Sequence, residues 1–299
     1  MRSCLQGSVA GLGFMLLVAA AGAAERVRLV GDGEVTVTSD SNISRAQRDR
    51  DILPDASLLA AAGLTLLTEP TAQSALNLRA FVEGEAWADS EPLNRTTAGG
   101  QMIGRWQPRL GYLAPVYQLT LTTQLDDYGA DQRDSLVHTA QLFATRRLND
   151  RTLFSYGVEA QERHSDGTVF DTSHGRLFLN ADFELSRAWN AYTAWSWLHG
   201  DTFSSAQREF CNGVAANDII GLLLASEEFE SDEGLNEAYC GQWIAYRLPA
   251  ETHVVTLGLN HVFSHRLSAD FSAQGVRVNG KGDNDYDRLL LRAGLLMRF

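Results

Sequence analysis

The sequence predicts an all-β protein, a transmembrane antiparallel up-and-down β-barrel of about twelve strands. Three observations lead to this fold class. Hydrophobic and polar residues alternate with a period of two through most of the chain. The connections between alternating segments are short and long in turn, as in a meander of antiparallel strands. Aromatic residues gather near the expected strand ends, where the two interfaces of a membrane would lie.

The composition excludes several classes of protein. The chain has 299 residues, of which 44% are hydrophobic, so it is too apolar to be disordered. Its 37 acidic side chains outnumber the 25 basic ones, and the net charge is −12. Because so acidic a chain cannot neutralise a phosphate backbone, we expect no nucleic-acid partner. After the first 25 residues no apolar run reaches the length of a transmembrane helix.

Residues 1–24 have the pattern of a secretory signal peptide. Arg2 precedes an apolar stretch, which ends in a run of small residues. We expect cleavage after Ala23 or Ala24. The chain is therefore expected to be exported, with residues 25–299 forming the mature barrel.

Each alternating run is expected to form one strand, with apolar side chains towards lipid and polar ones towards the lumen. The last run is the clearest, because Arg292 and Arg298 stand on the face opposite its apolar residues. An even number of strands would place both termini on the short-turn, periplasmic side. The expected strands are residues 34–43, 56–68, 74–88, 98–113, 116–128, 134–148, 152–164, 173–186, 189–201, 252–264, 267–279 and 286–299.

One connection, residues 202–251, is much longer than the others and is expected to be extracellular. It holds Cys211 and Cys240, the two cysteines that remain after signal removal. In an exported chain such a pair predicts a disulfide. Residues 217–229 could form a short apolar helix. Three roles stay open for this loop: a lid folded into the pore, a surface that binds a partner, or a stabilised decoration without specific function.

The inward faces of the expected strands carry charges of both signs. Seven residues of each sign predict a mixed network rather than a lumen of one sign. Such a network would line a narrow, hydrated pore that discriminates polar solutes, or its members would only satisfy one another. The expected pore-lining residues are Arg79, Arg105, Arg109, Arg147, Arg163, Arg176, Arg292, Glu83, Glu85, Asp126, Glu159, Asp182, Glu184 and Asp270.

A possible catalytic group lies on the outward face near the external rim. The turn at residues 149–150 predicts that His138 lies opposite Glu162, and the following loop predicts that Ser173 lies opposite His164. A Ser–His pair oriented by a carboxylate could support acyl transfer on lipid. Polar residues are also ordinary at a membrane rim, so the alternative is that no active site exists there.

No motif for a cofactor or a metal is present. The sequence has no phosphate-binding glycine loop, no HExxH and no Cys/His spacing typical of a metal site. We therefore expect neither a cofactor nor a metal.

The C-terminal strand ends in Phe299, and Met297, Leu295 and Ala293 precede it at alternate positions. With the signal peptide and the amphipathic strands, this ending makes the mature chain resemble Gram-negative outer-membrane β-barrel proteins. The resemblance implies an outer-membrane location, contact with outer-membrane lipid, and recognition of the last strand by the barrel-assembly machinery.

The stretch Asp40-Ser41-Asn42-Ile43-Ser44-Arg45 supports a second, weaker resemblance. It is similar to the opening of the barrel domain of surface lipoprotein assembly modifier proteins. This chain departs from that group because it lacks the helical-repeat amino-terminal domain and has fewer expected strands.

We therefore expect a monomeric or weakly oligomeric outer-membrane barrel. Its expected function is a channel for passive passage or export of small polar or oligomeric solutes. One alternative is an outer-membrane lipid hydrolase with an outward-facing Ser/His site. Another is a surface-exposed binding or export-accessory barrel.

Overall fold

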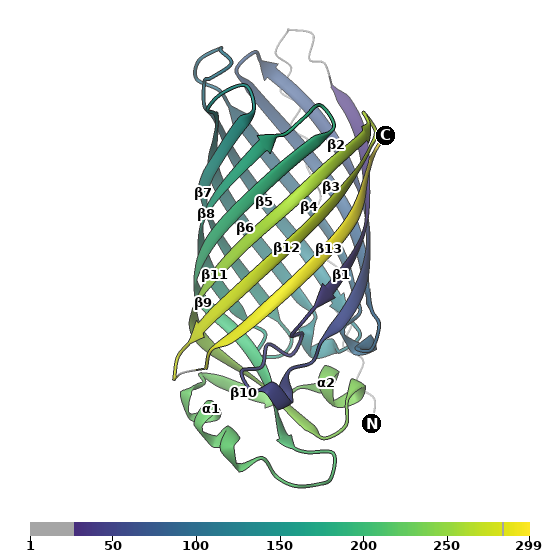
Figure 1. Ribbon diagram of the computed structural model, residues 1–299, viewed down its shortest axis with the longest axis vertical. Helices are drawn as coiled ribbons and strands as arrows, with labels where there is room; N and C mark the ends of the chain where they lie inside the picture. Colours follow the sequence, from purple (N-terminus) through teal and green to yellow (C-terminus); the bar gives the residue numbers. More distant parts are fainter. Residues whose placement is uncertain (1–26, 283) are drawn as a thin grey trace, which may run out of the picture.

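The computed structural model describes residues 27–282 and 284–299, in which twelve long antiparallel strands close into one barrel (Figure 1). The order runs from β1 to β9 and then through β11, β12 and β13, which pairs back to β1. β9 pairs directly with β11, because the short β10 lies beside the end of β11 outside the closed wall. The predicted fold class and strand number are confirmed.

The elements have the following bounds. The strands are β1 (Arg28–Asp40), β2 (Asp55–Thr71), β3 (Ser74–Trp87), β4 (Arg95–Trp106), β5 (Val116–Tyr128), β6 (Ser135–Arg147), β7 (Thr152–Ser165), β8 (Thr172–Glu184), β9 (Trp189–Glu209), β10 (Glu228–Ser231), β11 (Gln242–Ser264), β12 (Leu267–Gly280) and β13 (Tyr286–Arg298). The helical segments are η1 (Asp49–Asp51), η2 (Glu91–Leu93), η3 (Asp131–Arg133), η4 (Asn217–Ile219), α1 (Ile220–Ala225) and α2 (Glu233–Ala238). None of the helices in the described residues is long and apolar enough to cross a membrane.

The two ends of the barrel differ in their connections, as the sequence predicts. At the short-turn end, drawn at the top of Figure 1, β11 and β12 are joined by two residues and the chain ends at Phe299. At the long-loop end, the longest connections are residues 41–54 and 210–241. We call these two segments the plug and the cap. The predicted signal peptide, residues 1–24, lies outside the described residues.

Several predicted strand boundaries are wrong. β1 ends at Asp40, because residues 41–43 turn into the barrel. β4 ends at Trp106 instead of residue 113, and residues 107–115 form a connection that contains Pro108, which cannot donate a ladder hydrogen bond. β9 and β11 continue well past residues 201 and 252.

The extensions of β9 and β11 pair with each other from Thr202 opposite Leu248 to Gln242 opposite Glu209. Both faces of this hairpin are covered, so it does not show the one-sided alternation of the membrane wall. Ser205 and Trp243, for example, are each 1% exposed. The predicted loop 202–251 is therefore a strand hairpin that carries the shorter cap.

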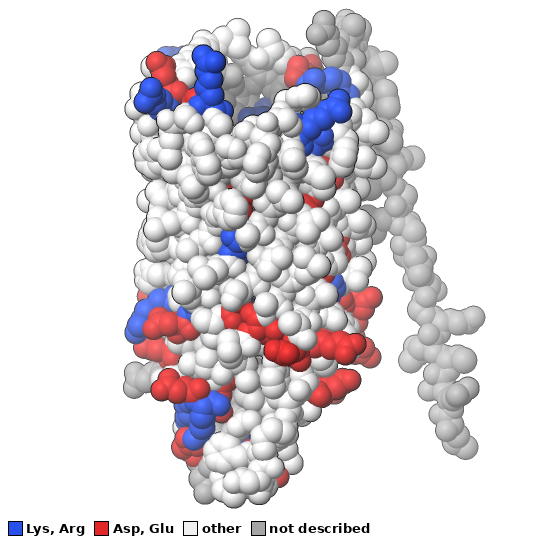
Figure 2. Space-filling view, turned by 45° about the vertical axis from the view of Figure 1, so that its right-hand side comes forward, with Lys and Arg blue, Asp and Glu red and all other residues white. Residues whose placement is uncertain are grey.

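The outward face of the wall is apolar. Val37 on β1 and Leu291 on β13 are 53% and 50% exposed, whereas their neighbours Thr38 and Leu290 are buried. Figure 2 shows a broad, largely uncharged band around the middle of the barrel. This is the surface that a membrane-spanning barrel presents to lipid, and closure of β13 on β1 leaves no unpaired edge in the wall.

Part of the predicted aromatic girdle is present on the outer face. Trp106 and Tyr117 stack near the short-turn end, with ring centroids 5.7 Å apart. Trp87 and Tyr128 instead line an interior cavity. Trp87 packs there against the apolar cluster that the inward-folded loops form.

The buried core lies at the long-loop end rather than along the barrel axis. One cluster joins Ile43 of the plug, Leu93 of η2, Leu235 of α2 and Trp243 of β11, all at most 8% exposed. These residues come from four separate connections or strands. Their contacts fold the loops together over this end of the barrel.

The cap contains the predicted disulfide. Cys211 and Cys240 are bonded, with Cα atoms 5.2 Å apart, and they close the base of the cap. The predicted apolar helix at residues 217–229 is partly confirmed, since η4 and α1 cover residues 217–225 and β10 follows.

Candidate functional site

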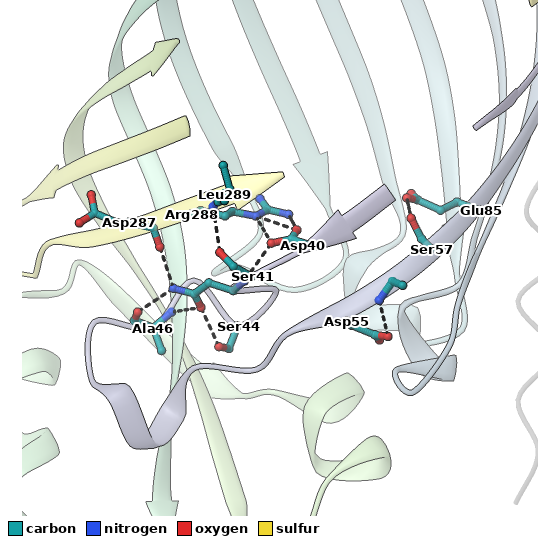
Figure 3. A network of polar contacts seen from close by, with 12 residues as sticks. Asp40, Ser41, Ser44, Ala46, Asp55, Ser57, Glu85, Asp287, Arg288 and Leu289 are labelled. Atoms are coloured by element: carbon teal, nitrogen blue, oxygen red, sulfur yellow. Dashed lines mark hydrogen bonds and ion pairs between the residues drawn. The ribbon is translucent and has the colours of Figure 1, made fainter. Parts of the chain in front are cut away.

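The plug begins with a turn built around Asn42. The Asn42 Oδ1 accepts hydrogen bonds from the Ala46 backbone N at 3.0 Å and the Ser44 Oγ at 3.0 Å (Figure 3). The Asn42 Nδ2 donates to the Asp287 carbonyl at 3.2 Å, which ties the turn to β13. Ser44 Oγ also donates to the Asp51 carbonyl at 2.7 Å. These bonds turn the chain from the end of β1 into the barrel.

An ion pair holds the start of the plug against the last strand. The Nε of Arg288 lies 2.9 and 2.8 Å from the two carboxylate oxygens of Asp40 (Figure 3). The Asp40 carboxylate, which is fully buried, also accepts a hydrogen bond from the Asn42 backbone N at 2.9 Å. Charge-assisted bonds of this kind are about twice as strong as neutral ones, so the inward turn is firmly anchored.

Two cavities lie inside the barrel, and both are lined in part by the plug. The first has a volume of about 310 Å³ and is lined from β5, β7 to β9 and β11 to β13. The second has a volume of about 470 Å³ and is lined from β1 to β5, β12 and β13. The residues that line both cavities are Arg45, Tyr128, Arg133, Val276 and Arg288. At its short-turn end the barrel is visibly hollow (Figure 2).

Two pairs of the expected pore-lining residues meet inside the barrel, one between β5 and β7 and one between the neighbouring strands β7 and β8. Arg163 Nη2 lies 3.0 Å from Asp126 Oδ2, and Arg176 Nη2 lies 2.7 Å from Glu159 Oε2. Thr97 Oγ1 also donates to Asp126 at 2.8 Å. The charges in this part of the wall therefore neutralise each other locally.

Three more of the expected residues have partners that the sequence analysis did not select. Arg79 pairs with Asp32 at 2.6 Å, and Glu85 pairs with Arg95 at 3.2 Å. Asp270 accepts a hydrogen bond from the hydroxyl of Tyr192 at 2.8 Å.

The remaining expected residues are spread along the barrel. Glu83 lies in the middle of β3, and Arg292 on β13 lines the second cavity. Arg105, Arg147, Asp182 and Glu184 lie towards the short-turn ends of their strands, and Arg147 stands over the ring of Tyr112 at 4.8 Å. Arg109 is a correction, because it lies in the connection 107–115 and not in a strand of the wall.

Sequence reasoning missed the residues that divide the interior. Arg288 and Asp40 share the inward side of β13 and β1, so alternation alone could have selected them. Arg45 and Arg133 lie in connections, and no local pattern shows that these connections fold into the barrel.

The possible catalytic group does not form a Ser–His pair. The predicted register of His138 opposite Glu162 is confirmed, but Ser173 also lies opposite Glu162 and not opposite His164. The Ser173 Oγ donates to Asp201 at 3.2 Å. His138 Nδ1 contacts Thr123 Oγ1 at 3.1 Å, and His164 lies 3.4 Å from Glu162.

Ser173, His138 and Glu162 nevertheless share one open outer groove. The register of β7 with β8 differs from the expected one by two residues, because the last pair of this ladder is Arg163 with Thr172. Within residues 27–282 and 284–299, no group of three or more His, Cys, Asp or Glu residues could hold a metal ion.

Comparison with known proteins identifies the fold. An outer membrane channel from Pseudomonas putida F1 matches over 91% of this chain and 95% of its own, with 12% identity and a TM-score of 0.54. Two porins match less well. An anion-selective porin from Comamonas acidovorans has a TM-score of 0.41 and 10% identity, over 92% of this chain and 100% of its own. The NanC porin has a TM-score of 0.43 and 7% identity, over 88% of this chain and 98% of its own.

No protein-family model and no curated protein matches the sequence. These structural matches give no support to the resemblance to lipoprotein assembly modifier proteins. The stretch from Asp40 to Arg45 has a structural role of its own as the inward turn of the plug. The chain has the fold of the outer-membrane β-barrel proteins of Gram-negative bacteria.

Proposed function

We propose that the protein is an outer-membrane channel for small polar solutes, narrowed at its long-loop end by the plug and the cap. The observation that carries this proposal is the pair of polar cavities inside the barrel, which meet at the arginines of the plug region. A barrel whose interior served only as a core would be filled with side chains and leave no open volume. Here the interior holds ion pairs and open volume.

The cap supports this proposal because it is fastened to the barrel through buried polar contacts. Asp232 is fully buried; it accepts hydrogen bonds from Arg133 Nη2 at 2.9 Å and Ser205 Oγ at 2.6 Å. It also caps α2 through the Leu235 backbone N at 3.2 Å. A cap held in this way restricts the exit and still leaves the short-turn end hollow.

The same proposal includes an orientation and partners. The long-loop end would face the exterior and the short-turn end the periplasm, with the outer wall in outer-membrane lipid. The Phe299 side chain is 74% exposed at the end of β13, where the barrel-assembly machinery could bind it. We propose a monomer or a weak oligomer.

Liposome swelling tests the channel, because uptake of a polar solute shows passage directly. The cap can be removed cleanly, since a short linker can span the 5.2 Å between the Cα atoms of Cys211 and Cys240. We expect slow swelling of wild-type proteoliposomes in glycine or arabinose, and several-fold faster swelling when residues 212–239 are replaced by two glycines.

The matched control is the double substitution Cys211→Ser and Cys240→Ser, which keeps the cap sequence and should swell nearly as wild type. Absence of swelling in both the wild-type and the cap-deleted protein would exclude the channel.

A second candidate function is binding of a partner by the cap. Four apolar residues of the cap are exposed: Val214, Ile220, Leu224 and Phe229, at 54%, 60%, 82% and 57%. Cap deletion would then remove an interaction without changing solute uptake, whereas a restricting cap predicts the opposite result.

A further inference from the structure

The side chain of Arg45 lies where the two interior cavities meet. It lines both cavities, and its guanidinium Cζ stands 3.9 Å from the ring centroid of Phe203. The other arginines of the first cavity each have a carboxylate partner: Arg133 with Asp232, Arg163 with Asp126 and Arg288 with Asp40. In the described part of the chain, no carboxylate pairs with Arg45.

The backbone holds Arg45 in this position at a cost. Arg45 is the one non-glycine residue with positive φ among the described residues, at 56°. This left-handed conformation is strained for an ordinary residue, and such conformations cluster at functional sites. The Ser204 Oγ donates to the Arg45 carbonyl at 2.5 Å, and the Ser205 N donates to the Ser44 carbonyl at 2.9 Å. The plug is therefore fixed on both sides of Arg45.

Surrounding charges make the site favourable for an anion. Burial lowers the pKa of Arg45 to about 10, and the charges of Arg288 and Arg133 lower it further against the opposing effect of Tyr286. The guanidinium still carries its charge at neutral pH. The wall of the first cavity has four arginines and one carboxylate, Asp201, which accepts hydrogen bonds from the Ser173 N and Oγ at 3.1 and 3.2 Å.

This local excess of positive charge contrasts with the net charge of −12 for the whole chain. Of the four arginines in the first cavity, Arg133, Arg163 and Arg288 are each paired with a fully buried carboxylate. The charge without a carboxylate partner is that of Arg45. Arg45 is half-buried, and an unpaired charge that is partly removed from water is costly. A bound anion would reduce that cost.

One side of the first cavity is apolar and indicates what kind of anion fits. Phe170 and Phe203 pack edge to face with centroids 4.9 Å apart, and Leu198, Val254 and Val278 also line the cavity. Polar side chains, which include Gln161, Thr172 and His174, form other parts of its wall. A cavity of about 310 Å³ is within the range of small-molecule sites, which are mainly apolar with a few placed polar groups. A guanidinium fork binds a carboxylate through two parallel hydrogen bonds.

We infer that Arg45 is the central residue of a binding site for a small organic carboxylate with an apolar body, on the path through the barrel. This inference rests on the proposed channel and names its class of solute. The carboxylate would bind Arg45, and the carbon chain would pack against Phe203 and Phe170. Passage from one cavity to the other then proceeds past Arg45, which favours anions over neutral molecules of the same size.

Binding of butanoate to the detergent-solubilised full chain tests the site without depending on transport. Tryptophan fluorescence or calorimetry at low salt would give the Kd for butanoate and for the neutral butanamide. We expect butanoate to bind and butanamide not to bind. Arg45→Gln should weaken butanoate binding about tenfold or more, because a charge-assisted pair is lost. Arg45→Lys should keep most of the affinity.

Two features of the variants keep the result interpretable. Glutamine and lysine have the same Cβ as arginine, so the backbone cost at positive φ is unchanged. The matched control is Arg292→Gln, which removes a cation from the second cavity alone and should leave butanoate binding within twofold of wild type. Retention of the heat-modifiable band on an unheated gel would show that each barrel is folded.

Current across planar bilayers then separates this inference from the channel itself. In a KCl gradient we expect a reversal potential that favours anions in the wild type and shifts towards zero in Arg45→Gln. Butanoate binding that is equal in wild type and Arg45→Gln would overturn the carboxylate site while leaving the channel intact. Binding that depends on Arg45, together with no current or swelling in any variant, would overturn the channel and keep the site.

Discussion

The two ends of this barrel are built in different ways. At the short-turn end, connections of a few residues close neighbouring strands, and the interior is hollow (Figure 2). At the long-loop end, the plug, the cap and the loops between them pack into clusters of buried residues and buried ion pairs. The wall forms from strands in which apolar and polar residues alternate and which hydrogen-bond to their neighbours. The closed end forms only through contacts between residues far apart in the sequence.

The largest effect is expected at the closed end, where Asp232 holds the cap. Asp232→Ala would leave the Arg133 guanidinium, 11% exposed in its side chain, buried without its partner. Breaking a buried pair from one side costs about 3–5 kcal/mol. We expect the cap to detach, seen as faster proteolysis within residues 212–239, while the wall keeps its strand content by circular dichroism.

The control for this prediction is Asp218→Ala on the surface of the cap. Asp218 is 50% exposed in its side chain and pairs with Arg50 at 2.7 Å, so its loss should cost at most about 1 kcal/mol. Equal proteolysis rates for the two variants would show that the buried pair does not fasten the cap.

The stability of the wall should depend on the volume of the side chains packed across neighbouring strands. A Cβ at Gly258 on β11 would clash with the Tyr192 ring, which lies across it from β9. Gly258→Ala should destabilise the barrel by about 1–3 kcal/mol through overpacking. Gly84→Ala on β3, where an added Cβ has no neighbour within 4 Å, should stay within about 0.5 kcal/mol of wild type. Urea midpoints in lipid vesicles would measure both, and similar midpoints would contradict the packing of Tyr192.

The smallest effect concerns the pH dependence of the plug. Burial raises the pKa of the Asp51 carboxyl above its ordinary value of 3.8, although Arg50 and the Gln207 backbone oppose the shift. The folded state therefore holds this proton more tightly than the unfolded state. The resulting stability is fully present below pH 3.8 and is lost as the pH rises through the folded pKa.

Asp51→Asn should remove this loss. The difference in the free energy of unfolding between the variant and the wild type should then be about 1 kcal/mol more favourable to the variant at pH 7 than at pH 3.5. The exposed neighbour Asp49→Asn is the control, and it should leave the pH dependence unchanged. The raised pKa of Asp51 would be contradicted if the wild-type stability fell on acidification through this range and fell less in Asp51→Asn.

The sequence predicted the wall well and the closed end poorly, for a physical reason. Lipid on one side and water on the other impose alternation on each strand, so single strands such as β13 can be recognised from local sequence alone. The extensions of β9 and β11 do not have lipid on one face and water on the other, because protein covers both faces. Residues 202–209 therefore show no regular alternation, and the sequence predicted a loop there.

The candidate site shows the same division. Pairs within the wall, such as Glu159 with Arg176, follow from register and were partly predictable. Arg45 and Arg133 reach the interior only because their loops fold inward, and this depends on contacts with Ser204 and Asp232 that lie more than ninety residues away in sequence. The predicted register of Ser173 is wrong by two residues, and such a shift changes which side chains meet.

Accessibility of a single cysteine from each side of the membrane tests most directly whether one end is open and the other restricted. Thr36 lines the second cavity, and its neighbour Val35 is 39% exposed on the outer wall. In liposomes with the barrel inserted in one direction, we predict that an impermeant thiol reagent labels Thr36→Cys quickly from the short-turn side and slowly from the long-loop side, with Val35→Cys as the unlabelled control. Equal labelling of Thr36→Cys from both sides, unchanged by deletion of the cap, would contradict the account.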